Sequence, residues 1–130
     1  MERSLPPGLL YKLMMMAVLI EAASGLALVV LPGFASWLVF GAASDDTGRA
    51  MARLAGVALV ALAMSCRPTV GARWPQRGML AYNAFVAILL ISIGSAGLTV
   101  GWLLWPAAVA HAVLAVLLAV LMFWKAATGP

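Results

Sequence analysis

The stretch LLYKLMMMAVLIEAASGLALVVL, from Leu9 to Leu31, decides the fold of this chain. Its 23 residues suffice for a helix, which rises ~1.5 Å per residue, to cross a hydrocarbon core of ~30 Å. One acidic residue, Glu21, lies near the middle of this stretch. Because a charge at the bilayer centre costs ~2.5–3.5 kcal/mol or more, we expect Glu21 to face other helices and to have a partner or a proton there.

The composition of the chain is that of a membrane protein. Of its 130 residues 65% are apolar and 9% are charged, whereas soluble globular chains have about 45–50% and about 25%. The first apolar segment lacks an Ala-x-Ala type cleavage site and is followed by three more, so we expect it to be retained and not to be a signal peptide. The basic residues flank apolar segments, so the net charge of +4 indicates membrane topology and no nucleic-acid binding. We predict one integral domain, residues 1–130, in the lipid bilayer.

Helix-ending and helix-capping residues divide the chain into four spanning segments. Pro32-Gly33 ends the first, the polar run 44–46 can cap the second, and Arg67-Pro68 ends the second. Residues 34–40 are too few to cross, and their aromatic content predicts a short helix at the membrane interface. The predicted spans are about residues 9–31, 49–66, 78–98 and 102–124, with loops at 67–77 and 99–101.

The charges and the tryptophans predict the topology. Basic residues lie before the first span, between the second and third, and after the fourth, so the positive-inside rule places both termini in the cytoplasm. The predicted fold is an all-α, antiparallel bundle of four transmembrane helices, multi-pass in a bacterial inner (cytoplasmic) membrane. In this topology the outer belt holds Trp37, Trp102 and Trp105, and the inner belt holds Trp74 and Trp124.

Each span contributes at least one polar residue to the interior. Small residues at helical spacing surround Glu21, Arg53 and His111, which indicates that these faces pack against neighbouring helices. The depth of each polar residue in the membrane follows from its distance to the predicted helix end, at ~1.5 Å per residue. The candidate ligand or proton site comprises Glu21, Arg53, Ser92 and His111, in one middle-to-outer layer, and Tyr82 and Asn83, nearer the cytoplasm.

Two interpretations of Glu21 remain open. In the first, Glu21 forms a structural ion pair or hydrogen-bonded network with Arg53 and His111, which neutralises its charge and fixes the register of the helices. In the second, it is a proton switch, because burial disfavours a charged carboxylate whereas a neighbouring arginine favours it. The choice depends on whether Arg53 reaches Glu21 or extends to the membrane surface.

Other chemistry finds little support in the sequence. His111 is the only histidine, which excludes a bis-histidine haem site, and we do not expect haem or chlorophyll to bind through it. The single cysteine, Cys66, excludes an intramolecular disulfide and a Cys-x-x-Cys site. The consecutive methionines 14–16 point in three directions, which indicates packing and no metal site. With four acidic residues and no phosphate-binding or nucleophile motif, we predict no catalytic residues, and an enzyme is not the expected class.

Residues 49–63, RAMARLAGVALVALA, resemble the second helix of small bacterial four-helix membrane proteins of the DoxX-like kind. The resemblance extends to the order of the four spans and matches Arg53 and Gly56. It implies a four-helix membrane bundle that is sometimes associated with quinone-linked electron transfer. The absence of a cysteine pair here argues against a thiol-linked role.

Two functional hypotheses follow from the buried carboxylate. In the leading one, the site around Glu21 binds or transports a small hydrophobic or cationic molecule, with proton coupling, in a homo-oligomer, because four short helices enclose little volume. In the alternative, the chain is a non-catalytic accessory or assembly subunit of a larger membrane complex, such as an electron-transfer complex, and the polar interior is structural.

Overall fold

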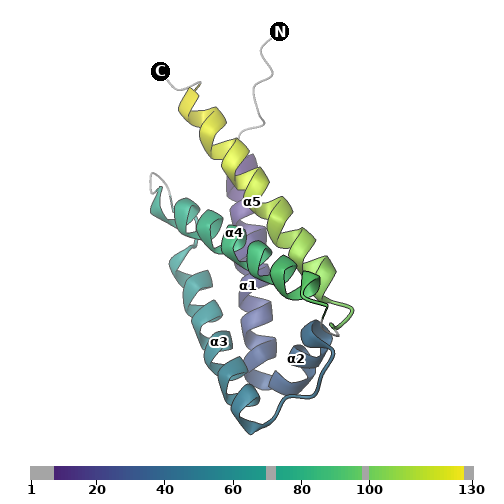
Figure 1. Cartoon of the computed structure of the whole chain (residues 1–130). Coiled ribbons are helices and arrows are strands. Elements are labelled where there is room, and N and C mark those ends of the chain that lie inside the picture. Colours follow the sequence, from purple (N-terminus) through teal and green to yellow (C-terminus); the bar gives the residue numbers. More distant parts are fainter. Residues whose placement is uncertain (1–7, 70–72, 98–99, 128–130) are drawn as a thin grey trace.

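The computed structural model describes residues 8–69, 73–97 and 100–127, with side chains as far as Phe123. These residues are organised in five helices, which confirms the all-helical prediction (Figure 1). Four of the helices, α1, α3, α4 and α5, are long and apolar enough to cross a membrane. The helices are α1 (Leu9–Val30), α2 (Pro32–Phe40), α3 (Asp46–Ser65), α4 (Trp74–Ser95) and α5 (Leu104–Ala127).

Two of the long helices begin earlier than predicted. Helix α3 starts at Asp46 and not at residue 49, because Asp45 caps it: the backbone N–H of Gly48 donates to Asp45 Oδ1 at 2.6 Å. Helix α4 starts at Trp74 and not at residue 78, and Pro75 lies in its first turn. The fixed φ of proline suits a first turn, where the missing N–H has no helical partner. The predicted loop at 67–77 therefore contributes one turn of helix.

The short helix α2 occupies the region predicted for it and is fastened to a distant segment. Its last carbonyls accept hydrogen bonds from the connection before α5: Gly101 N–H donates to Val39 O and Leu103 N–H to Leu38 O, both at 2.9 Å. The left-handed conformation of Gly41, with φ at 71°, ends α2 beside that connection. The connection between α4 and α5 thereby satisfies carbonyl groups that the end of a helix leaves unpaired.

Helices α1 and α3 touch through two glycines. A Cβ added to Gly25 would lie 2.7 Å from the carbonyl oxygen of Gly56, and a Cβ added to Gly56 would lie 2.6 Å from that of Gly25. Gly25 also faces Val60, whereas Gly56 faces Val29. Residues that precede Gly25 on α1 therefore lie level with residues that follow Gly56 on α3. The two backbones are in direct contact, as small residues allow in membrane helices.

The core joins two pairs of helices. Helix α1 packs mainly on α3, and α4 packs mainly on α5, and one apolar cluster connects all four. Met14 and Met79 are fully buried in it, so Met14 fills the core as predicted, whereas Met16 is exposed. A second cluster of Leu90, Leu104 and Ala108 lies between α4 and α5.

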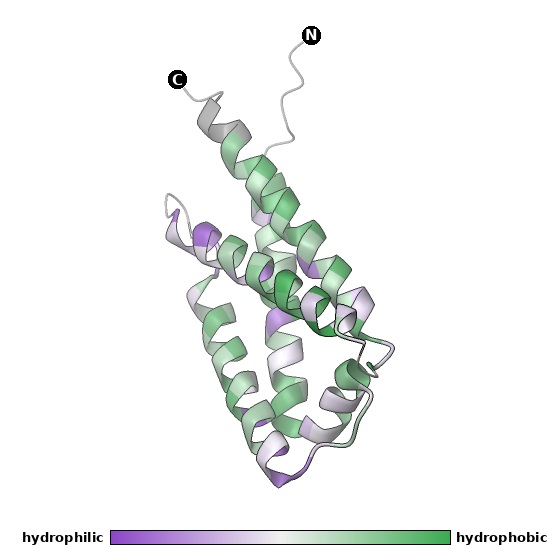
Figure 2. Cartoon of the chain, in the orientation of Figure 1, coloured by the Kyte–Doolittle hydropathy of each residue, from purple (hydrophilic) through white to green (hydrophobic). Residues whose placement is uncertain are grey.

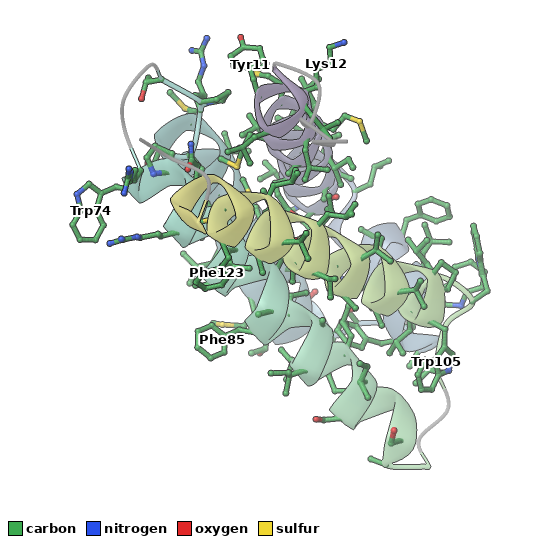
Figure 3. The ribbon with its side chains drawn as sticks, turned by 90° about the horizontal axis from the view of Figure 1, so that it is seen from above. Tyr11, Lys12, Trp74, Phe85, Trp105 and Phe123 are labelled. Carbon is green, nitrogen blue, oxygen red and sulfur yellow. The ribbon has the colours of Figure 1, made fainter. Side chains whose placement is uncertain are left out.

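The outer surface of the helices is strongly apolar. Figure 2 shows mostly hydrophobic residues along the long helices, with hydrophilic residues near their ends and at a few positions in between. Large side chains such as Phe85, Trp105 and Phe123 extend outward from the ribbon (Figure 3), and all three are exposed. In water such a surface would be costly, whereas in a bilayer it meets acyl chains. The chain thus has the exterior of a multi-pass membrane protein.

Candidate functional site

Four polar side chains from three helices meet in the interior, and we call them the polar cluster. The Tyr82 hydroxyl on α4 donates a hydrogen bond to Glu21 Oε2 on α1 at 3.0 Å. The next residue of α4, Asn83, places its Oδ1 2.8 Å from Nδ1 of His111 on α5. The same Nδ1 lies 3.7 Å from Glu21 Oε1, so the four side chains form one continuous group.

Glu21 is sealed from solvent, and only one of its oxygens is satisfied. The residue is 1% exposed. Oε2 accepts the Tyr82 hydrogen bond, whereas Oε1 has no hydrogen-bond partner among the described residues. The 3.7 Å to His111 Nδ1 is too long for a hydrogen bond but short enough for charge attraction. An unsatisfied buried acceptor costs roughly 1–3 kcal/mol, and more when charged, so Oε1 is a natural place for a proton or for a cationic group.

Asn83 connects the backbone of α4 to the imidazole of α5. Its Nδ2 donates to the carbonyl oxygen of Met79, one turn earlier, at 2.8 Å, and its Oδ1 faces His111. The side chain of Asn83 is fully buried. The Tyr82 ring packs edge-on against His111, with centroids 5.7 Å apart and planes at 80°. Two successive residues of α4 therefore fix the position of the His111 ring.

Buried apolar residues flank the polar cluster along its helices. Ala17 and Gly25, one turn on either side of Glu21, are buried, as are Met79 and Leu114, which lie about one turn from Asn83 and His111. In such surroundings charges interact strongly and a net charge is costly. The polar cluster therefore favours states in which the charge of a carboxylate is balanced by a proton or another cation.

Arg53 is not in the polar cluster, which corrects the predicted ion pair with Glu21. Its side chain is exposed on α3, and within the described part of the chain Glu21 has only Tyr82 and His111 as polar partners. The glycine contact explains the separation. Glu21 lies one turn before Gly25, level with residues after Gly56, whereas Arg53 precedes Gly56 by three residues. The two side chains therefore leave the crossing in opposite directions along the helices.

Ser92 is likewise absent from the polar cluster, although it was predicted in the layer of Glu21. It is exposed, and its hydroxyl donates to the carbonyl oxygen of Ile88 on its own helix at 2.7 Å. Ser92 follows Asn83 by nine residues, which is two and a half helical turns. Since α4 buries Asn83, Ser92 faces the opposite side.

Tyr82 and Asn83 lie level with Glu21 and His111, and not nearer one end as predicted. The depth was underestimated because α4 begins four residues before the predicted start, which amounts to about 6 Å along the helix. The signal that could have found this was Pro75, which is typical of a first helical turn. Within the described chain no three of the residue types His, Cys, Asp and Glu come together as a metal site.

The groups brought together here are a carboxylate, an imidazole, a phenol and an amide. They can hold and exchange protons and can accept a cationic hydrogen-bond donor. No family model matches the chain, and comparisons with curated proteins and with solved structures found no match, so the DoxX-like resemblance stays a prediction that depends on residues 49–63 and the order of the spans.

Proposed function

We propose that this protein binds a small, hydrophobic monovalent cation at Glu21 inside the membrane and carries it across the bilayer in exchange for a proton. The observation that supports the proposal most is the free oxygen Oε1 of a carboxylate that is 1% exposed and has no hydrogen-bond partner among the described residues. A group that donates to Oε1 and carries a positive charge would satisfy this oxygen and balance the carboxylate.

Charge balance supports the exchange of a proton for the cation. With one proton shared between Glu21 and His111, the polar cluster has no net charge. A bound monovalent cation together with that proton would leave one uncompensated positive charge in an apolar interior, which is unfavourable. Release of the proton restores neutrality, so the cation and the proton compete for the same carboxylate.

The proposal includes the environment and assembly of the protein. We place it in a bacterial inner membrane as a homo-oligomer, with both termini in the cytoplasm. The support for a membrane comes from four long apolar helices and an apolar exterior. The support for an oligomer is the small volume that four helices enclose, since a path for a cation beside Glu21 needs more room than one copy offers.

The Glu21→Gln variant tests the proposal, because it keeps the size of the side chain and removes its charge. We expect benzylguanidinium, a hydrophobic monovalent cation with N–H donors, to bind the detergent-solubilised protein and to enter proteoliposomes that contain it. Loss of a charge-assisted interaction of ~1.5–3 kcal/mol predicts at least about tenfold weaker binding by Glu21→Gln. The matched control is Ser92→Ala, which removes an exposed polar group outside the polar cluster. Equal affinity and flux in wild type and Glu21→Gln would overturn the proposal.

A second function, as an accessory or assembly subunit of a larger membrane complex, is favoured by Arg53. Its exposed guanidinium lies within a helix long enough to span the membrane, and among the described residues it has no acidic partner. An acidic residue of another subunit, such as one of the electron-transfer complex that the DoxX-like resemblance implies, would satisfy it. In that case Arg53→Gln releases the chain from partners that copurify with it, and Glu21→Gln lowers stability without changing any cation flux.

A further inference from the structure

The hydrogen bonds of Asn83 determine which nitrogen of His111 carries a proton. Asn83 Nδ2 donates to the carbonyl oxygen of Met79 at 2.8 Å, and a backbone carbonyl can only accept. The amide orientation is therefore fixed, and the atom that faces His111 Nδ1 at 2.8 Å is the carbonyl oxygen Oδ1. Oδ1 can also only accept, so Nδ1 must donate and must carry a hydrogen in every protonation state that keeps this bond.

The second ring nitrogen, Nε2, is left to gain and lose the proton of the imidazole. Nε2 forms no hydrogen bond within the described residues. Unlike Glu21 Oε1, it is not fully buried. The His111 side chain keeps 14% exposure, whereas that of Glu21 keeps 2%. The groups that face His111 are Glu21 of α1 and the hydroxyl and amide of Tyr82 and Asn83 on α4, and α2, which also contacts α5, has no titratable residue.

We propose that Asn83 is a positioning residue that holds His111 in the Nδ1–H form, so that Nε2 is the atom at which the ring takes up the proton that balances the sealed carboxylate of Glu21. A proton that arrives at Nε2 makes the ring an imidazolium, whose charge lies beside Glu21 Oε1. Loss of the proton from Nε2 returns the ring to neutrality and leaves the carboxylate without a countercharge, so that a cation can replace it. Asn83 thus selects the nitrogen that binds the proton of the proposed exchange, and its effect on the ring can be measured without any cation.

Because His111 is the only histidine, nitrogen-15 NMR of protein labelled at histidine reports on this ring alone. In the wild-type protein at a pH where the ring is neutral, we expect a protonated Nδ1 and an unprotonated Nε2. As the pH is lowered, the Nε2 resonance should move to the protonated position while Nδ1 stays protonated. A neutral ring with its hydrogen on Nε2 would overturn the proposal.

Two variants at residue 83 test the role of the amide. Asn83→Leu removes the acceptor, and we expect the hydrogen of the neutral ring to move to Nε2. Asn83→Asp keeps an oxygen toward Nδ1, and we expect the Nδ1–H form to remain. If Asn83→Leu keeps the Nδ1–H form, Asn83 is not the positioning residue. Should Asn83→Leu fail to fold, the wild-type spectrum and Asn83→Asp still decide, because a hydrogen on Nε2 in either contradicts the proposal. A failed proton–cation exchange with the Nδ1–H form intact would refute only the proposed function.

Discussion

Substitution of Gly56 by alanine perturbs the fold at its tightest contact. The new Cβ would lie 2.6 Å from the carbonyl oxygen of Gly25 and 2.9 Å from Val29 Cγ2, whereas ordinary contact begins at 3.4 Å. Helices α1 and α3 would have to part by about 0.8 Å at the crossing. Gaps of that size forfeit a quarter to a half of the dispersion energy of the atoms concerned, and overpacking of this kind costs ~1–3 kcal/mol. We expect Gly56→Ala to lower the free energy of unfolding by that amount.

Reversible unfolding in mixed detergent micelles, with increasing SDS and circular dichroism as the readout, measures this loss. Gly25→Ala should cost about as much, because its Cβ would meet Gly56 O at 2.7 Å. The double variant should cost less than the two single variants together, since one separation of the helices relieves both clashes. Gly33→Ala is the matched control: its Cβ would meet only Arg49 Cδ, at 3.8 Å, and should be neutral or slightly stabilising. Unfolding free energies of Gly56→Ala and Gly33→Ala that agree within error would refute the close contact.

Three further predictions follow from local geometry. Tyr82→Phe removes the hydrogen bond that Glu21 Oε2 accepts and should lower the free energy of unfolding by ~1–3 kcal/mol in the same detergent assay. Asp45→Ala removes the cap of α3 and should cost ~1 kcal/mol, measured in the same way. Burial raises the pKa of the Cys66 thiol, so less thiolate is present at a given pH. Alkylation of the folded protein should therefore be slow, and its rate should rise at a higher pH than for an exposed cysteine. The folded protein holds the proton of this thiol more tightly than the unfolded chain does. The contribution of the thiol to stability is therefore present below its ordinary pKa and is lost as the pH rises through the raised value.

Each of these predictions has a control within the chain. Tyr11→Phe changes a tyrosine that is 58% exposed and should leave stability unchanged, so equal losses at residues 11 and 82 would contradict the role of the hydrogen bond. Asp46→Ala removes only an exposed ion pair with Arg49, and it should cost less than Asp45→Ala. SDS-unfolded protein should alkylate rapidly at its single cysteine. Equal rates before and after unfolding would contradict the burial of Cys66.

The apolar segments and their breaks could be predicted because they follow from local chemistry. A proline-glycine pair begins α2 directly after the end of α1, and an aspartate caps α3, and both act within a few residues of themselves. The start of α4 was missed because Trp74 and Pro75, which lie between two arginines, were interpreted as part of a loop. Because this turn of helix was missed, the depths of Tyr82 and Asn83 were underestimated.

The contacts between helices could not be predicted with the same rules. Small residues around Glu21 and Arg53 indicated two packed faces, yet which residues meet across them depends on the crossing of Gly25 with Gly56. The hydrogen bonds that join α2 to Gly101 depend on where the chain returns some sixty residues later. Such pairings are set by the three-dimensional arrangement, and periodicity in one helix contains no information about them.

The central claim is that a cation and a proton compete for the carboxylate of Glu21. The most direct measurement is the number of protons released when benzylguanidinium binds the solubilised protein in weakly buffered solution near neutral pH, followed with a pH indicator. The account predicts close to one proton released per cation bound by the wild type, and for Glu21→Gln at least about tenfold weaker binding without proton release. Cation binding by the wild type without proton release, or the same release by Glu21→Gln, would contradict it.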